Sequence, residues 1–258
     1  MTEIVFLGTG GGRINLLKQL RRTGGFRINS ESANIHVDPG PGALSSSIHF
    51  KENVLDLDVL VVTHAHIDHC NDANIIIEGI SRHALKKRGI AIASKYALDG
   101  EKKGDRMISL YHQDRLDRVY RAKYGDRKKF KTNKGEFEIE MIRAEHDIED
   151  AFGFVLYIDG KVIGYTGDTE YYKGMGKKYE GCDYLVVNCM KPAEDPYPGH
   201  MTSGDVIKLL KKAKPKQAIL SHMGMKMIMA GPKKEAERIE KESRIKTLAA
   251  YDGMRIKC

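Results

Sequence analysis

The chain has 258 residues and a mass of 29.0 kDa, of which 41% of residues are hydrophobic and 30% are charged. This composition excludes a disordered, collagen-like or low-complexity protein. The formal net charge of the chain is +8. No apolar run reaches the ~20 residues of a membrane span, and the four cysteines lack a framework spacing, so we expect a cytoplasmic protein without disulfides or membrane contact.

Short apolar runs typical of β-strands dominate both halves of the chain, with helical patterns between them. We expect strands at 3–8, 33–38, 58–64, 90–94, 137–142, 152–158, 161–168, 184–188 and 218–222, and a strand with a turn at 247–258. Helices are expected at about 70–88, 109–124, 203–213 and 232–244. This order predicts an α/β fold, a sandwich of two mixed β-sheets flanked by helices. No linker divides the chain, so 1–258 is expected to be one domain.

The segment VLVVTHAHIDHC at 59–70 carries the strongest chemical signal. A buried strand is followed within six residues by His64, His66, Asp68 and His69. Imidazole and carboxylate groups together suit zinc, manganese or iron. The first two histidines can face one way from an extended turn, while Asp68 and His69 begin a helix and face another. The cluster can therefore serve two metal ions.

Three further donors follow apolar strands, where a sheet delivers side chains to a common edge. His146 follows the strand FEIEMI, Asp168 follows KVIGYTG, and His222 follows QAILS. One such residue is ordinarily a turn aspartate or a hydrogen-bonded histidine. Three in succession after the first cluster indicate one metal-binding edge.

These motifs resemble the metallo-β-lactamase superfamily, through THAHIDH (63–69), His146, GDT (167–169) and SH (221–222). FLGTGGGR (6–13) and DPGPG (38–42) extend the resemblance to the branch that holds tRNase Z and the PhnP-type phosphodiesterases. It implies a four-layer αβ/βα sandwich, the metallo-β-lactamase fold, with a two-metal site at one edge. By position, the first metal would be bound by His64, His66 and His146, the second by Asp68, His69 and His222, and both by a bridging Asp168.

The resemblance implies a dinuclear metal-dependent hydrolase, and we expect a phosphodiesterase. Two divalent ions ~3.5–4 Å apart share a hydroxide that attacks the phosphoester and neutralise charge on the phosphoryl oxygens. Asp68 would also orient the attacking water. The seven non-thiol donors fit zinc, with manganese or iron as alternatives.

His200, in GHMTSGDVI just before an expected helix, would be the general acid that protonates the leaving group. The resemblance implies this role, because the related branch has a histidine followed by threonine and a helix here. A carboxylate steadies that histidine in tRNase Z. Here NCMKPAEDP (188–196) offers Glu194 or Asp195. The alternative for His200 is an ordinary surface-turn histidine.

A basic insertion is expected around 102–134, where twelve Lys and Arg and four Asp account for a net +8. Tyrosine and phenylalanine are interleaved with these cations, so the segment suits RNA, although a solvated surface explains it equally well. The expected partner is a phosphoester substrate, with RNA as an alternative, and a homodimer is compatible with the sequence.

Two activities on the same fold remain open as alternatives. One is a tRNA 3′-processing endonuclease of the tRNase Z type, although the Gly/Pro-rich arm of that branch is missing from this sequence. The other is a lactonase or another carboxylic-ester hydrolase, because a fold does not fix the substrate. A nucleic-acid-binding module with a vestigial site is disfavoured by the complete donor set.

Overall fold

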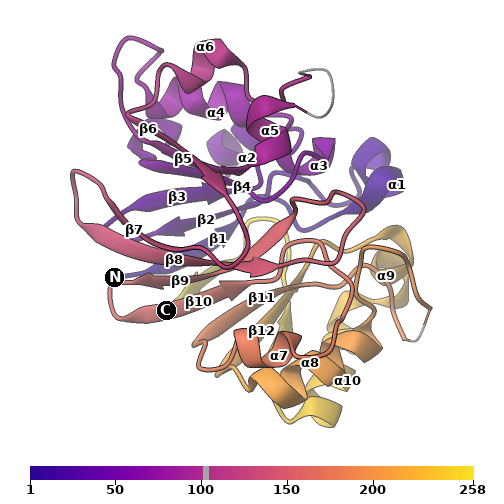
Figure 1. Cartoon of the computed structure of the whole chain (residues 1–258). Helices are drawn as coiled ribbons and strands as arrows, with labels where there is room; N and C mark the ends of the chain where they lie inside the picture. The colour runs from indigo at the N-terminus through magenta and orange to yellow at the C-terminus, as the bar shows by residue number, and fades with distance from the viewer. Residues whose placement is uncertain (101–104, 194) are drawn as a thin grey trace.

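The computed structural model describes residues 1–100, 105–193 and 195–258. Within these residues two mixed sheets of seven strands each pack face to face, with helices on both outer faces (Figure 1). The predicted sandwich is therefore confirmed. The first sheet has the order β14-β1-β2-β3-β4-β5-β6 and consists of β1 (Glu3–Phe6), β2 (Phe26–Asn29), β3 (Asn34–Val37), β4 (Val59–Val62), β5 (Ile90–Ser94), β6 (Arg118–Ala122) and β14 (Arg255–Lys257).

The second sheet has the order β13-β12-β11-β10-β9-β8-β7, antiparallel from β7 to β10 and parallel from β10 to β13. Its strands are β7 (Arg127–Lys131), β8 (Glu136–Arg143), β9 (Phe152–Ile158), β10 (Lys161–Tyr165), β11 (Tyr184–Asn188), β12 (Gln217–Ser221) and β13 (Thr247–Ala249). In the first sheet, the strands from β3 to β6 are parallel.

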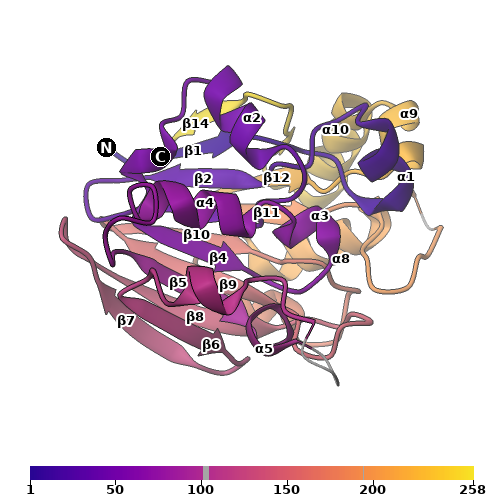
Figure 2. The same ribbon diagram turned by 90° about the horizontal axis from the view of Figure 1, so that it is seen from above.

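Helices from the first half of the chain cover the first sheet, as the view from above shows for α2 and α4 (Figure 2). These elements are α2 (Ala43–His49), η1 (Val54–Asp56), α3 (Ile67–Cys70), α4 (Ala73–Ile80), α5 (Lys95–Asp99) and α6 (Leu110–Gln113). The second sheet is covered by α7 (Met175–Lys178), α8 (Ser203–Ala213) and α10 (Pro232–Ser243). Two short helices, α1 (Gly12–Lys18) and α9 (Met225–Ala230), contact each other at the right of Figure 1.

Strand β4 is apolar at every position because both of its faces are covered. Val59 and Val61 belong to the core between the two sheets, whereas Leu60 and Val62 pack with α4 on the outer face. The same alternation in β11 sends Val186 toward the inter-sheet core and the neighbouring residues toward α8. The apolar runs are thus fixed by burial on two sides, and the polar donors begin where these runs end.

The prediction of a helix at 109–124 is wrong. Only Leu110–Gln113 is helical, and Arg118–Ala122 forms β6, which pairs in parallel with β5. The tertiary pairing overrides the local helical pattern, because an open edge of the first sheet accepts the segment RVYRA. The expected helix at 70–88 likewise divides into α3 and α4 and ends at Ile80.

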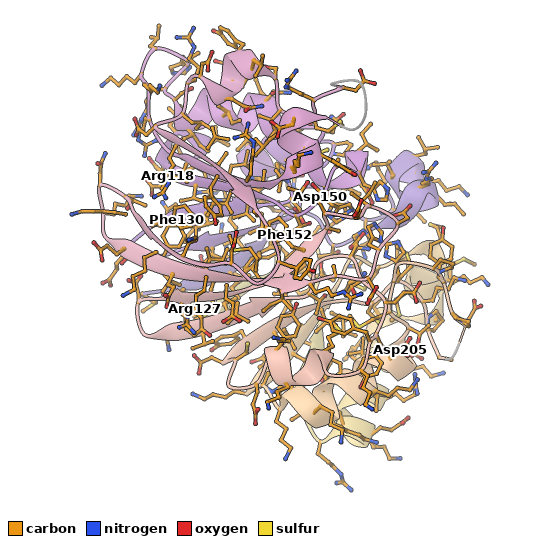
Figure 3. The ribbon with its side chains drawn as sticks, viewed as in Figure 1. Arg118, Arg127, Phe130, Asp150, Phe152 and Asp205 are labelled. Atoms are coloured by element: carbon orange, nitrogen blue, oxygen red, sulfur yellow. The ribbon has the colours of Figure 1, made fainter. Side chains whose placement is uncertain are left out.

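The basic stretch 102–134 supplies β6 and β7, which are edge strands of the two sheets. Its first residues, 102–104, lie outside the described residues. Along β7, the residues Arg127, Lys129 and Lys131 stand opposite Glu140, Glu138 and Glu136 of β8. Charged side chains also protect an edge strand against pairing with other chains. Figure 3 shows the labelled arginines of β6 and β7 at the left, on the other side of the molecule from Asp205 at the start of α8.

His36 lies in β3 and is fully buried. Its Nε2–H donates to the carbonyl oxygen of Gly24 at 2.8 Å, and its Nδ1 has no partner among the described residues. Burial lowers the pKa of His36 to about 3. The unfolded chain therefore binds a proton near pH 6.5, while the folded chain binds it only near pH 3. The neutral His36 ring therefore contributes fully to the unfolding free energy above pH 6.5, and this contribution is lost as the pH falls toward 3.

The substitution His36→Gln retains an N–H donor but does not titrate. Between pH 7.5 and 4.5, the unfolding free energy of the metal-free wild type is expected to fall by about 2–3 kcal/mol more than that of the variant. Urea unfolding at both pH values measures this difference. Parallel losses in the two proteins would show that His36 is protonated in the folded state.

Candidate metal centre

The centre is built on the turn that follows β4. His64 comes directly after Thr63 and is fully buried, and His66, with extended backbone (φ −68°, ψ 142°), is the N-cap of α3. The short helix then carries Asp68 and His69 on adjacent positions. The extended turn followed by a helix start divides the four donors into two directions, as the sequence predicts.

Three histidines form the first group of donors. Nδ1 of His66 lies 3.2 Å from Nε2 of His64 and 3.1 Å from Nε2 of His146, which follows β8. Burial lowers the pKa of His64 well below its ordinary value, so this ring is neutral and carries a lone pair. Three ring nitrogens thus converge on one point.

The second group joins α3 to the ends of β10 and β12. Nε2 of His69 lies 3.1 Å from Nε2 of His222, and Oδ2 of Asp168 lies 3.1 Å from both nitrogens. Oδ2 of Asp68 is 3.4 Å from Nε2 of His222. The backbone of His222 is left-handed (φ 52°), a conformation that few non-glycine residues adopt.

Asp168 lies between the two groups. Its Oδ2 is 3.9 Å from Nε2 of His64 and within 3.1 Å of the second group, while its buried Oδ1 has no hydrogen-bond partner. Burial raises the pKa of Asp168, but the imidazoles of His222 and His69 outweigh it and hold the pKa well below its ordinary value. An ionised carboxylate is therefore shared by both groups.

These spacings fit metal coordination. A tetrahedral ion with ligands at ~2.0–2.1 Å separates neighbouring donors by roughly 3.3–3.4 Å, close to the nitrogen–nitrogen distances here. The second ring nitrogen of His146 has a partner outside the donor group. Nδ1–H of His146 donates to the carbonyl oxygen of Gly199 at 3.0 Å, which leaves the lone pair of Nε2 facing the group. The seven predicted donors are thus brought together in a form that divalent cations can occupy.

Asp38, which follows β3, fixes the second group from behind. Its carboxylate accepts hydrogen bonds from Nδ1–H of His69 at 3.0 Å, from N–H and Oγ1–H of Thr63 at 2.7 and 2.8 Å, and from the hydroxyl of Tyr165 at 3.1 Å. Asp38 lies in the DPGPG motif (38–42) and is not among the predicted site residues. The signal that identifies it is an aspartate directly after a buried strand, beside the donor edge.

The substitution Asp38→Asn is expected to weaken metal binding about 10- to 100-fold, because His69 loses the acceptor that orients it. Chelator competition with metal-free protein measures the affinity. Asp159→Asn is the matched control, since this exposed carboxylate holds a distant turn through Glu31 and Ser32. Unchanged affinity in Asp38→Asn would remove Asp38 from the support of the metal centre.

His200 lies beside the second group. Its ring stacks on Tyr197 and on His222, with centroids 5.4 and 5.3 Å apart, and its Nδ1 is 3.6 Å from Oδ2 of Asp168. Burial lowers the pKa of His200 to about 4. The residue is therefore part of the site and not a surface-turn histidine.

The partner expected for His200 is not Asp195, which pairs with Lys191 and Lys226 at 3.2 and 2.9 Å. Glu194 lies outside the described residues. Instead, the side-chain amide of Asn188, at the end of β11, lies 3.2 Å from Nδ1 of His200. Among the residues that the structure describes, the buried Oδ1 of Asn188 has no partner, and rotating the amide would let this oxygen accept the Nδ1–H of His200.

Glycine backbone closes around the donors. A Cβ added to Gly11 would collide with the ring of His222, and a Cβ added to Gly199 would collide with the ring of His146. These glycines let the chain approach the imidazoles more closely than any other residue allows. The glycine-rich segment 8–13 therefore packs against the donor edge.

The donors open into a cleft of about 730 Å³, which we call the metal cleft. Its wall includes Asp68, His66, His146, Asp168 and His200, and its other side is formed by α1 and the segment at Tyr197 and Pro198. A donor set of imidazoles and carboxylates at the wall of an open cleft can bring bound cations and a substrate together.

Residues 33–223 match the family model described as the beta-lactamase superfamily domain. The uncharacterized protein MJ1374 of Methanocaldococcus jannaschii is 34% identical over 256 residues, 98% of this chain and 94% of the relative. A UPF0173 metal-dependent hydrolase of Pyrococcus abyssi is 27% identical over 206 residues, 74% of this chain and 77% of the relative.

Solved structures share the fold at low identity. The metallo-beta-lactamase fold protein YhfI of Bacillus subtilis has a TM-score of 0.79 at 17% identity, covering 99% of this chain and 98% of that one. The short form of human tRNase Z has a TM-score of 0.73 at 17% identity, covering 99% of this chain and 98% of that one. A diphosphatase of the PhnP family has a TM-score of 0.70 at 14% identity, covering 100% of this chain and 98% of that one.

The chain therefore belongs to the metallo-β-lactamase superfamily. Within it, the protein is a metal-dependent hydrolase, and the predicted family and enzyme class are confirmed. In the described parts of the chain, no helix combines the length and hydrophobicity needed to cross a bilayer.

Proposed function

We propose that this protein is a dinuclear metal-dependent phosphodiesterase. The observation that carries the proposal is that two groups of donors share one oxygen, Oδ2 of Asp168, at the wall of a cleft that also contains His200. One group alone would suit a structural metal. Two groups with a shared carboxylate suit a paired site that clamps a phosphoester.

The proposed ligands are those that the resemblance implies: His64, His66 and His146 for one cation, Asp68, His69 and His222 for the other, and Asp168 for both. Nitrogen and carboxylate donors without thiols favour zinc, with manganese or iron as alternatives. When bound, such a pair supplies a hydroxide at neutral pH and neutralises charge on the phosphoryl oxygens.

The chain's own groups then act on the attacking water and the leaving group. Asp68 accepts the N–H of Gly12 at 3.2 Å through Oδ2, which fixes the carboxylate beside the cleft to orient the attacking water. His200 donates a proton to the departing alkoxide. Its pKa of about 4 makes the free ring neutral at pH 7, and the negative charge of a bound phosphodiester favours protonation.

A second candidate is a tRNA 3′-processing endonuclease, favoured by the likeness to the short form of human tRNase Z. The charges of β7 weaken the case for RNA binding there, because Glu136, Glu138 and Glu140 stand opposite three of its four cations and Arg127 pairs with Glu138 at 2.8 Å. We therefore place the small phosphodiester first.

A hydrolysis screen on the metal-loaded protein tests the proposal. Bis-p-nitrophenyl phosphate and cyclic nucleotides represent small phosphodiesters, and a lactone and a precursor tRNA represent the alternatives. We expect turnover of the phosphodiesters, lost in the metal-free protein and in His64→Ala. Turnover of the lactone alone, or of precursor tRNA alone, would replace the proposed function.

We further propose that 1–258 acts as one hydrolase domain, because the terminal strands β1 and β14 pair with each other. A cytoplasmic location is supported by the cysteines, all of which are free thiols among the described residues.

A further inference from the structure

A second cavity of about 260 Å³ adjoins the metal cleft, and we call it the side chamber. Gly12, Arg13 and Tyr197 line both spaces, so they form the boundary between them. None of the proposed metal ligands lines the side chamber. A group held there would lie beside the metal centre without occupying it.

The walls of the side chamber are largely apolar. Ile14, Met190 and Met225 contribute apolar side chains, and the methionine-rich segment SHMGMKMIM divides between the core, at Met223 and Met227, and this wall. Gly11, Gly12, Asn15 and Gly224 also line it, and the remaining lining residues are Tyr197 and the three cations Arg13, Lys191 and Lys226. Flexible thioethers adapt to a ligand and make favourable contacts with aromatic rings.

The cations around the side chamber differ in their partners. Lys191 and Lys226 both pair with the carboxylate of Asp195, and Lys191 also lies over the ring of Tyr197 at 4.8 Å. Arg13 makes no hydrogen bond or ion pair with any residue that the structure describes, although it stands at the boundary. A free guanidinium at this place can pair with the oxygens of a phosphoryl group.

The position of His200 decides which half of an ester enters the side chamber. His200 lines the metal cleft and a polar hollow beside Glu170 and Asp205, but not the side chamber. The leaving group departs toward His200 if this residue protonates it. The retained group then points the other way, between Arg13 and Tyr197.

On the basis of the proposed function, we propose that the side chamber binds an aromatic ring on the retained half of the phosphodiester, and that Arg13 pairs with its phosphoryl oxygens. The preferred substrate is thus a small phosphodiester with a planar apolar substituent, such as an aryl or a nucleobase-like ring. Apolar burial and cation pairing act on opposite ends of this half of the substrate.

Three esters of p-nitrophenyl phosphate, with methyl, cyclohexyl or phenyl as the retained group, test the proposal with one leaving group. Wild-type protein is expected to prefer phenyl over methyl by about 10- to 100-fold in kcat/KM, and phenyl over cyclohexyl. Ile14→Asp should reduce the phenyl preference to near parity. Ile14 is 62% exposed, so the variant folds, and Leu20→Asp, at a 58% exposed leucine outside both spaces, is the matched control.

Arg13→Ala is expected to raise KM about tenfold for all three esters with a smaller change in kcat, and Arg13→Lys should restore part of the loss. Lys18→Ala, which removes a cation from the same helix outside both spaces, should not change KM. In a binding assay, phenyl phosphate should compete with substrate about tenfold more strongly than methyl phosphate.

The outcomes separate this inference from the proposed function. If none of the three esters is hydrolysed by the metal-loaded wild type, the proposed function fails, and direct binding of phenyl phosphate to wild type and Ile14→Asp still decides the role of the side chamber. Equal rates for phenyl and methyl, equal rates for phenyl and cyclohexyl, or a phenyl preference that survives Ile14→Asp would each overturn the inference.

Discussion

Replacing Asp168 with alanine is expected to release both metal ions and to reduce hydrolysis to near the metal-free level. Its Oδ2 lies within 3.1 Å of His69 and His222 and 3.9 Å from His64, so one substitution removes a donor from both groups. The paired cations would also lose the anionic charge that holds them together. Metal analysis after dialysis, together with turnover of bis-p-nitrophenyl phosphate, measures both effects.

Two further variants make this result specific. Asp168→Asn keeps the shape of the side chain but replaces an anionic ligand with a poor one, so it should also lose both metals if charge and bridging matter. Asp99→Ala removes a half-buried carboxylate that pairs with Arg121 and belongs to neither donor group, and it should retain metal and turnover. Full metal content in a folded Asp168→Ala protein would refute the shared-ligand assignment.

The second large effect is expected for His200→Ala and depends on the leaving group. An alkoxide is a poor leaving group without a proton donor, and general-acid assistance is typically worth ~10²–10⁴-fold. The variant should lose about that factor on an alkyl phosphodiester and far less on a p-nitrophenyl ester, whose leaving group is already a stable anion. The metal content should not change, because His200 is outside the proposed ligand set.

The substitution His200→Gln tests the same role in another way. Glutamine retains a hydrogen-bond donor but cannot deliver a proton, so it should resemble alanine on the alkyl ester. His49→Ala, at an exposed histidine of α2, is the matched control. Equal losses on both kinds of ester would reduce His200 to a residue that positions the substrate.

Much of the architecture follows from local sequence. The apolar runs of β4, β9 and β12 are buried on two sides, so no other element suits them. The N-cap of α8 is Thr202, one residue before Ser203, and its side chain forms a capping box with Asp205. The donors after β4, β8, β10 and β12 could also be predicted, because a polar residue at the end of a buried strand has only the edge of the sheet to occupy.

Other elements were decided by the tertiary structure. The segment RVYRA is short, and its charges resemble a helix surface, yet an unpaired edge of β5 makes it a strand. The cations of β7 by themselves suggest a surface that binds RNA. The register of β7 with β8, however, places glutamates opposite Arg127, Lys129 and Lys131. Pairing between strands determines both outcomes, and pairing is not a local property.

The same division holds within the site. The sequence by itself determined which residue types gather at the donor edge, since their spacing relative to the strands is local. Only the folded chain placed Asp38 behind His69, Asn188 beside His200 and Arg13 between two cavities. These contacts join segments that are distant in the sequence, so their physical cause is the packing of the two sheets rather than any motif.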